Sequence, residues 1–158
     1  MLKSLKVGMG FGLSSATITT LGLMIGLESS TSSKLAVIGG ILTIAIADSC
    51  SDALGVHIAK ESEGNFSTKE IWQTTMFTFL FKAVFALTFV IPVLFLPLTT
   101  AIYTALVWGA IILIFQSYKL AKSKKVNPLG VIGEHFLIAA LVMVATHFTG
   151  DWIAGYFK

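Results

Sequence analysis

Two acidic residues stand four positions apart inside an otherwise apolar stretch of the chain. Asp48 and Asp52 follow the run LAVIGGILTIAIA. Residues at positions i and i+4 share one face of a helix, so the two carboxylates are expected to project together. If this helix crosses a bilayer, each ionised aspartate near the centre costs ~2.5–3.5 kcal/mol. The pair therefore needs a partner, a proton or a metal ion.

The composition indicates a membrane protein. The 158 residues are 55% hydrophobic and only 12% charged, whereas soluble domains contain about 25% charged residues. We therefore expect an integral, multi-pass protein of the cell membrane, in contact with lipid. The net charge of +3 comes from lysines alone. It bears on membrane orientation, and no nucleic-acid partner is expected. The single cysteine, Cys50, excludes an internal disulfide.

Five apolar segments are each long enough for the ~20 residues that a membrane-spanning helix needs. They run approximately over Val7–Leu27, Leu35–Ala59, Ile71–Leu96, Thr99–Tyr118 and Leu129–Ile153. The third segment contains Pro92 and an intramembrane lysine, Lys82. The sequence predicts an all-α fold with one five-helix transmembrane domain over residues 1–158.

The lysines indicate how the helices are oriented. If the N-terminus is inside, eight of the eleven lysines lie at cytoplasmic ends of the helices, namely Lys3, Lys6, Lys60, Lys69, Lys119, Lys122, Lys124 and Lys125. The opposite side then holds only Lys34 and Lys158. Because cytoplasmic loops collect lysine and arginine, we predict that the N-terminus is inside and the C-terminus outside.

The helical rise places the buried charges at two levels of the membrane. At ~1.5 Å per residue, Asp48 and Lys82 both lie ~16 Å from the cytoplasmic ends of their segments. Asp52 and Glu134 lie ~10 Å and ~8 Å deep. We therefore expect Asp48 and Lys82 to be within salt-bridge reach. No lysine is left to neutralise Asp52 and Glu134, which favours a functional role for this second pair.

A structural interpretation is open for each of these groups. Asp48 and Lys82 could form an ion pair that only stabilises the fold, because intramembrane ions usually pair, and Glu134 could simply be protonated. His57 lies at the water boundary, where a solvated helix end is the alternative to lining an ion pathway. Acidic groups nevertheless recur from one side of the membrane to the other, as a cation pathway requires.

The segment SDALGVHIAKESE, preceded by the glycine- and threonine-rich GFGLSSATITTLGLMIGL, resembles the vacuolar iron transporter family. The number of spans and the link between the second and third spans are similar as well. The resemblance implies a homodimer of five-helix subunits that exports ferrous iron or manganese from the cytosol in exchange for protons. It also implies an ion pathway along the first two helices, near the dimer axis.

The chain departs from the family pattern between its second and third spans. Eukaryotic members carry a long cytoplasmic metal-collecting domain there, whereas this chain has only the eleven residues Lys60–Glu70. Glu61 and Glu63 are therefore at most the remnant of such a metal-collecting site, and the alternative is that they are solvated side chains at the polar end of the helix.

Two further departures lie within the spans. The family usually has a pathway aspartate before a Gly-Leu pair in the first helix, and here Phe11 stands in that place. Asp52 falls where the family has a pathway methionine. The site would therefore be harder, because oxygen replaces sulfur as a ligand.

We accordingly predict a transporter, not an enzyme, for a divalent transition metal such as Fe2+ or Mn2+, with no resident cofactor. Asp48 and Asp52 would bind the ion, assisted by Glu134 and by the first-helix hydroxyls of Ser15 and Thr19. Metal binding needs deprotonated carboxylates, so proton exchange follows from competition. Alternatives are the transport of another cation or a small solute, and a non-transporting membrane subunit that docks a cytoplasmic partner through its basic loops.

The first helix carries a signal for close helix contact. Gly22 and Gly26 fit the small-xxx-small pattern. Together with the family resemblance, this pattern predicts a homodimer through the first helix, with Gly22 and Gly26 at the interface.

Overall fold

The computed structural model describes residues 2–157, with side chains from residue 4, and this part of the chain is built from helices without strands. The helices are α1 (Leu2–Thr31), α2 (Lys34–Glu63), α3 (Thr68–Thr88), α4 (Val90–Phe95), α5 (Leu98–Lys124) and α6 (Pro128–Phe157). Five spans are long and apolar enough to cross a membrane, and α3 and α4 together form the third, Thr68–Phe95. The predicted all-α, multi-pass fold is confirmed.

Local sequence signals set the ends of the helices around the second span. Ser33 caps α2, because its hydroxyl accepts a hydrogen bond from the Ala36 amide at 3.2 Å. Gly64 ends α2 with a φ of 67°, a left-handed conformation that favours glycine. Ser67 and Glu70 then form a capping box that starts α3. The polar link between the second and third spans is therefore a tight turn.

Pro92 accounts for the break between α3 and α4. Its ring crowds the carbonyl of Thr88 four residues earlier and leaves that carbonyl without an amide donor. α3 accordingly ends at Thr88, and α4 begins two residues later at Val90. Trp108 of α5 donates a hydrogen bond from Nε1 to Thr88 Oγ1 at 3.0 Å, so α5 covers the break.

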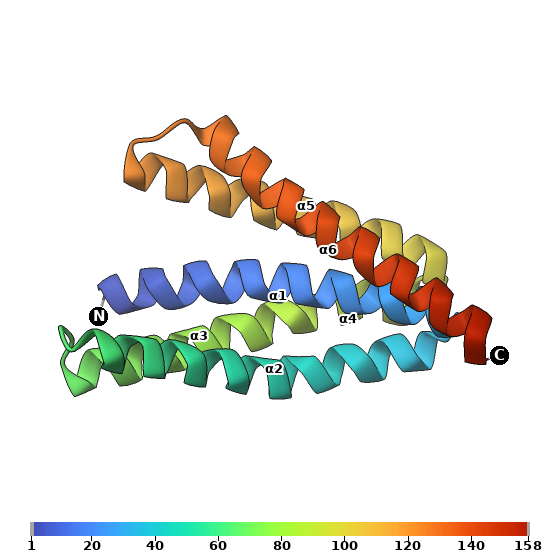
Figure 1. Ribbon diagram of the computed structural model, residues 1–158, viewed down its shortest axis with the longest axis horizontal. Helices are drawn as coiled ribbons and strands as arrows, with labels where there is room; N and C mark the ends of the chain where they lie inside the picture. Colours follow the sequence, from blue (N-terminus) through green and yellow to red (C-terminus); the bar gives the residue numbers. More distant parts are fainter. Residues whose placement is uncertain (1, 158) are drawn as a thin grey trace.

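The two ends of the chain lie at opposite ends of the bundle (Figure 1). The start of α1, the α2–α3 turn and the α5–α6 link share one end, which is the end rich in lysine. The assignment of this end to the cytosol depends on that lysine distribution. Lys158, which the sequence analysis placed on the opposite side, lies outside the described residues.

α1 is the central helix, and Figure 1 shows it between the α2–α3 pair and the α5–α6 pair. Its most extensive packing is on α3 and on α6. A methyl group on Gly8 would lie 2.6 Å from Cβ of Phe77, so the backbones of α1 and α3 approach closely. Small residues permit such an approach between membrane helices.

Gly22 and Gly26 occupy the interface between α1 and α6 of the same chain. A methyl group on Gly22 would lie 3.0 Å from Cγ1 of Val142, and one on Gly26 would lie 3.4 Å from the carbonyl oxygen of Thr146. The prediction that these glycines contact a second subunit is therefore wrong. The pattern indicates close helix contact, but it does not specify which helix is the neighbour.

The buried interior is apolar at one end and polar towards the other. The apolar cluster gathers around the C-terminal half of α1 and includes Leu21, Met24, Val37, Ile41 and Phe89. Buried polar side chains lie from mid-bundle towards the N-terminal end of α1, and they include Ser4, Ser49, Thr74, Thr78 and Lys82. Polar groups inside a membrane need protein or water partners. The polar half of the bundle is therefore where an ion site can form.

Candidate ion-binding site

Lys82 of α3 contacts both aspartates of α2. Its Nζ lies 2.5 Å from Oδ2 of Asp48 and also forms a salt bridge with Oδ2 of Asp52. The lysine side chain is only 1% exposed, whereas the side chains of Asp48 and Asp52 are 31% and 22% exposed. One buried ammonium therefore serves two partly open carboxylates. We call these three side chains the charge cluster.

Helical periodicity brings the charge cluster together. On α3, every fourth residue from Thr74 through Thr78 and Lys82 to Ala86 is buried. On α2, Asp48 and Asp52 lie beside a similar buried stripe that contains Ser49. Residues four apart stand above one another on one helix face, so both aspartates turn towards the same lysine.

α1 fixes the position of the lysine backbone. A methyl group on Gly12 would lie 3.0 Å from the amide nitrogen of Lys82 and 3.1 Å from the carbonyl oxygen of Thr78. Gly8, four residues earlier, lies against the same helix. Gly8 and Gly12 thus form a second small-xxx-small pair. Their spacing was the signal that would have pointed to a helix contact here.

Ser15 adds a hydroxyl from α1 to the charge cluster. Its Oγ donates a hydrogen bond to Oδ2 of Asp52 at 2.5 Å. Thr19 was expected to assist in the same way, but its Oγ1 donates to the carbonyl oxygen of Ser15 at 2.8 Å. Of the two first-helix hydroxyls predicted to line the site, only that of Ser15 bonds to an aspartate.

The surroundings of the charge cluster differ on its two sides. Ala16, Ala45 and Ala86 pack together with Phe85 on the side away from the N-terminal end. Ser49 and Thr78 are fully buried, and their hydroxyls have no hydrogen-bond partner within the described chain. Buried hydroxyls without partners are uncommon and call for an explanation.

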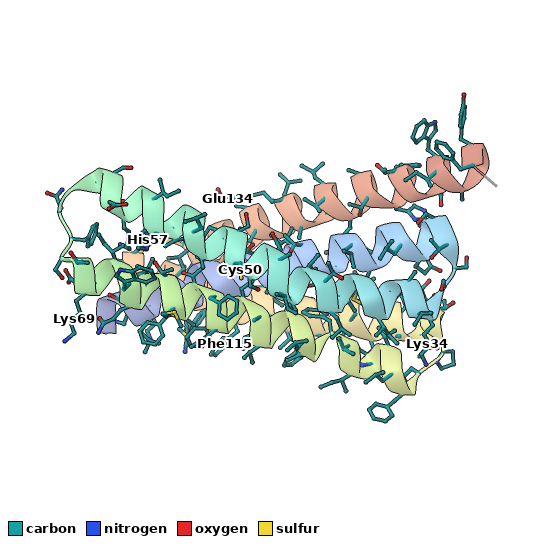
Figure 2. The ribbon with its side chains drawn as sticks, turned by 90° about the horizontal axis from the view of Figure 1, so that it is seen from below. Lys34, Cys50, His57, Lys69, Phe115 and Glu134 are labelled. Atoms are coloured by element: carbon teal, nitrogen blue, oxygen red, sulfur yellow. The ribbon has the colours of Figure 1, made fainter. Side chains whose placement is uncertain are left out.

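Glu134 does not join the aspartates. It is exposed on α6, and α1 lies between α6 and α2 (Figures 1 and 2). Lys82, which was expected to pair with Asp48 from its depth in the membrane, also forms a salt bridge with Asp52. The expectation that Asp52 and Glu134 form an unneutralised pair is therefore wrong. Depth along the helices was not enough, because the rotation of each helix decides which groups meet.

The polar end of α2 is separate from the charge cluster. Glu61 and Glu63 are exposed in its last turn. His57, labelled on α2 in Figure 2, bonds through Nδ1 to Oγ1 of Thr75 at 3.0 Å and lies edge-on to Trp72. It lines a shallow groove of 270 Å³ between α2 and α3. Among the described residues, no three histidine, cysteine or acidic side chains come together as a metal-binding group.

Comparisons of the chain with protein-family models, with curated proteins and with solved structures find no match. The resemblance to the vacuolar iron transporter family therefore stays a prediction. The assignment of function depends on the charge cluster and on its place within the spanning helices.

Proposed function

We propose that the protein transports a divalent transition metal, Fe2+ or Mn2+, across the membrane, and that Asp48 and Asp52 bind the ion. The observation that carries this proposal is that both carboxylates hold one buried cation, the ammonium of Lys82, within the spanning helices. Charged groups inside spanning helices are rare and mark ion pathways, which makes them candidates for a functional site. The site already binds a positive charge, and its carboxylates are partly open.

The ligand chemistry favours a hard or borderline ion. Asp48 and Asp52 offer carboxylate oxygens, and Ser15 offers a hydroxyl oxygen within hydrogen-bond distance of Asp52. Oxygen ligands suit Mn2+, and Fe2+ follows it in the affinity order of divalent metals. Metal ligands must be deprotonated, so loading competes with protons. We propose export from the cytosol by proton exchange, in the manner of the vacuolar iron transporter family.

We also propose a homodimer in which a second copy covers the open side of the charge cluster. The side chains of Asp48 and Asp52 are 31% and 22% exposed within one subunit. Ionised carboxylates do not face hydrocarbon without cost, so protein or water must cover them. Phe11, one turn before Ser15 on the same face of α1, is 44% exposed, so we propose that it lies in the contact. A contact through Phe11 would not involve Gly22 and Gly26.

Flux into liposomes that contain only this protein tests the proposal. We expect Mn2+ uptake that is driven by an opposed pH gradient and is lost in Asp52→Ala. If the protein transports a monovalent cation but not Mn2+, its cargo is a different ion. If the purified protein carries no cation, the charge cluster is structural, and the alternative of a non-transporting membrane subunit is favoured.

A further inference from the structure

The ammonium of Lys82 occupies one oxygen of each carboxylate that is proposed to bind the transported ion. It contacts Oδ2 of Asp48 and Oδ2 of Asp52. Within the described residues, no other basic side chain forms a salt bridge with either aspartate. A divalent ion placed between the carboxylates would sit against this ammonium and be repelled by it. The ion and the lysine head therefore cannot share the two carboxylates.

A second position for the ammonium lies one helical turn away. Thr78 is fully buried on the same face of α3, and its Oγ1 has no hydrogen-bond partner among the described residues. Side chains four residues apart on a helix are neighbours, and long side chains lean towards the helix N-terminus. A lysine stem on this face is therefore expected to lean towards Thr78, whose buried hydroxyl has no hydrogen-bond partner among the described residues.

Thr78 differs in this respect from its neighbours on α3. Thr74 and Thr75 donate their hydroxyl protons to carbonyls of their own helix at 2.8 and 2.9 Å, as threonines in helices commonly do. Gly12 packs against the backbone of Lys82. The backbone is thus held in place, and only the flexible stem can carry the ammonium from one acceptor to the other.

We infer that Lys82 is a tethered counter-cation, which replaces the transported ion at Asp48 and Asp52 when the site is empty. This inference rests on the proposed function. When the ion binds, the ammonium moves to Oγ1 of Thr78. When the ion leaves, the ammonium returns to the two carboxylates. A proton from the opposite side neutralises the one negative charge that a single ammonium leaves over, so the returning site carries the exchanged proton. Two carboxylates without a cation would oppose the return of the empty site, because buried charges without partners are strongly unfavourable.

The first test is Lys82→Met, with Mn2+ as the probe. Removing the competing ammonium should lower the Kd for Mn2+ by about tenfold or more. The reason is that Mn2+ no longer has to displace a charged hydrogen bond between Lys82 and the aspartates. Net Mn2+ uptake should fall, because the empty site no longer returns. Exchange of isotopically labelled Mn2+ for unlabelled Mn2+ should persist, because exchange uses only the loaded form. A purely structural lysine predicts weaker Mn2+ binding and loss of both fluxes.

The second test does not disturb the ion pairs. Thr78→Val removes the free hydroxyl with little change in shape, so thermal stability should be unchanged or higher. Mn2+ binding should nevertheless weaken, because the ammonium loses its second acceptor. Thr74→Val is the matched control, since Thr74 is equally buried on the same helix face and its hydroxyl is satisfied by its own helix. In the Lys82→Met background, Thr78→Val should have no further effect on Mn2+ binding.

The outcomes separate the inference from the proposed function. Wild-type protein that neither binds nor carries Mn2+ would overturn both. If the wild type carries Mn2+, weaker binding or normal net uptake in Lys82→Met would overturn the inference alone. Equal behaviour of Thr78→Val and Thr74→Val would do the same, and this comparison decides the matter if Lys82→Met fails to fold.

Discussion

Gly12 of α1 lies directly against the backbone of Lys82 of α3. A methyl group on Gly12 would lie 3.0 Å from the Lys82 amide nitrogen. We expect Gly12→Leu to separate the two helices and to abolish Mn2+ uptake, with a clear fall in thermal stability. Gly10→Leu is the matched control, since a Cβ at Gly10 meets nothing within 4 Å. Equal melting temperatures for the two variants in detergent would contradict the close contact.

The charge cluster makes a prediction about stability that depends on Lys82 serving two partners. Removing one partner of a buried ion pair lowers the free energy of unfolding by ~3–5 kcal/mol. Because the aspartates are partly exposed, we expect the loss in Lys82→Met to lie at the lower end of this range. Asp48→Asn should cost less, because Lys82 keeps Asp52. The triple change Asp48→Asn/Asp52→Asn/Lys82→Met should recover most of the loss. Thermal unfolding in one detergent measures all three, and a triple variant no more stable than Lys82→Met would contradict the shared ion pair.

Asp52 and Glu134 should behave differently, although the sequence places them at similar depths. Asp52→Ala is expected to abolish Mn2+ uptake while the protein stays folded, because a proposed ligand is lost. Glu134→Gln should leave uptake within about twofold of wild type, since changes at exposed positions away from a site usually have small effects. Uptake and size-exclusion profiles of both variants provide the check. Loss of uptake in Glu134→Gln alone would require the cargo to pass along α6.

The same site should change its ion preference when its ligand changes. Asp52→Met replaces an oxygen ligand by sulfur, and softer ions prefer sulfur. We therefore expect reduced Mn2+ uptake and a relative gain for a softer ion such as Cd2+. Competition between the two ions in the liposome assay measures the shift. An unchanged ratio of the two ions would mean that the side chain at 52 does not bind the cargo.

The proposed dimer can be tested at Phe11. In a Cys50→Ala background, Phe11→Cys should crosslink between subunits in the membrane, because Phe11 is exposed and lies one turn from Ser15, which bonds to Asp52. Val142→Cys on α6 is the control, since it faces Gly22 inside the subunit. Crosslinks at position 142 but not at position 11 would put the interface elsewhere. Gly22→Leu should lower the stability of each subunit whether or not a dimer forms.

The sequence by itself determined the spans and the depth of the charges. Apolar length alone identified five membrane helices, because a bilayer of given thickness demands about 20 apolar residues for each. The i, i+4 spacing of Asp48 and Asp52 placed them on one helix face, and the helical rise placed Lys82 at the level of Asp48. Pro92 lies three residues after the break in the third span, and its ring and missing amide account for that break. All of these features depend on neighbours in the sequence.

Only the tertiary structure decided which side chains meet. Hydropathy and helical rise specify a position along the membrane normal, but not the rotation of a helix about its own axis. That rotation depends on contacts between distant segments, such as Gly12 against Lys82 and Gly22 against Val142. It turned Asp52 towards Lys82, and it left Glu134 on α6, which α1 separates from α2 in Figure 1. Partners of buried charges are thus set by packing, whereas the need for a partner is set by the membrane.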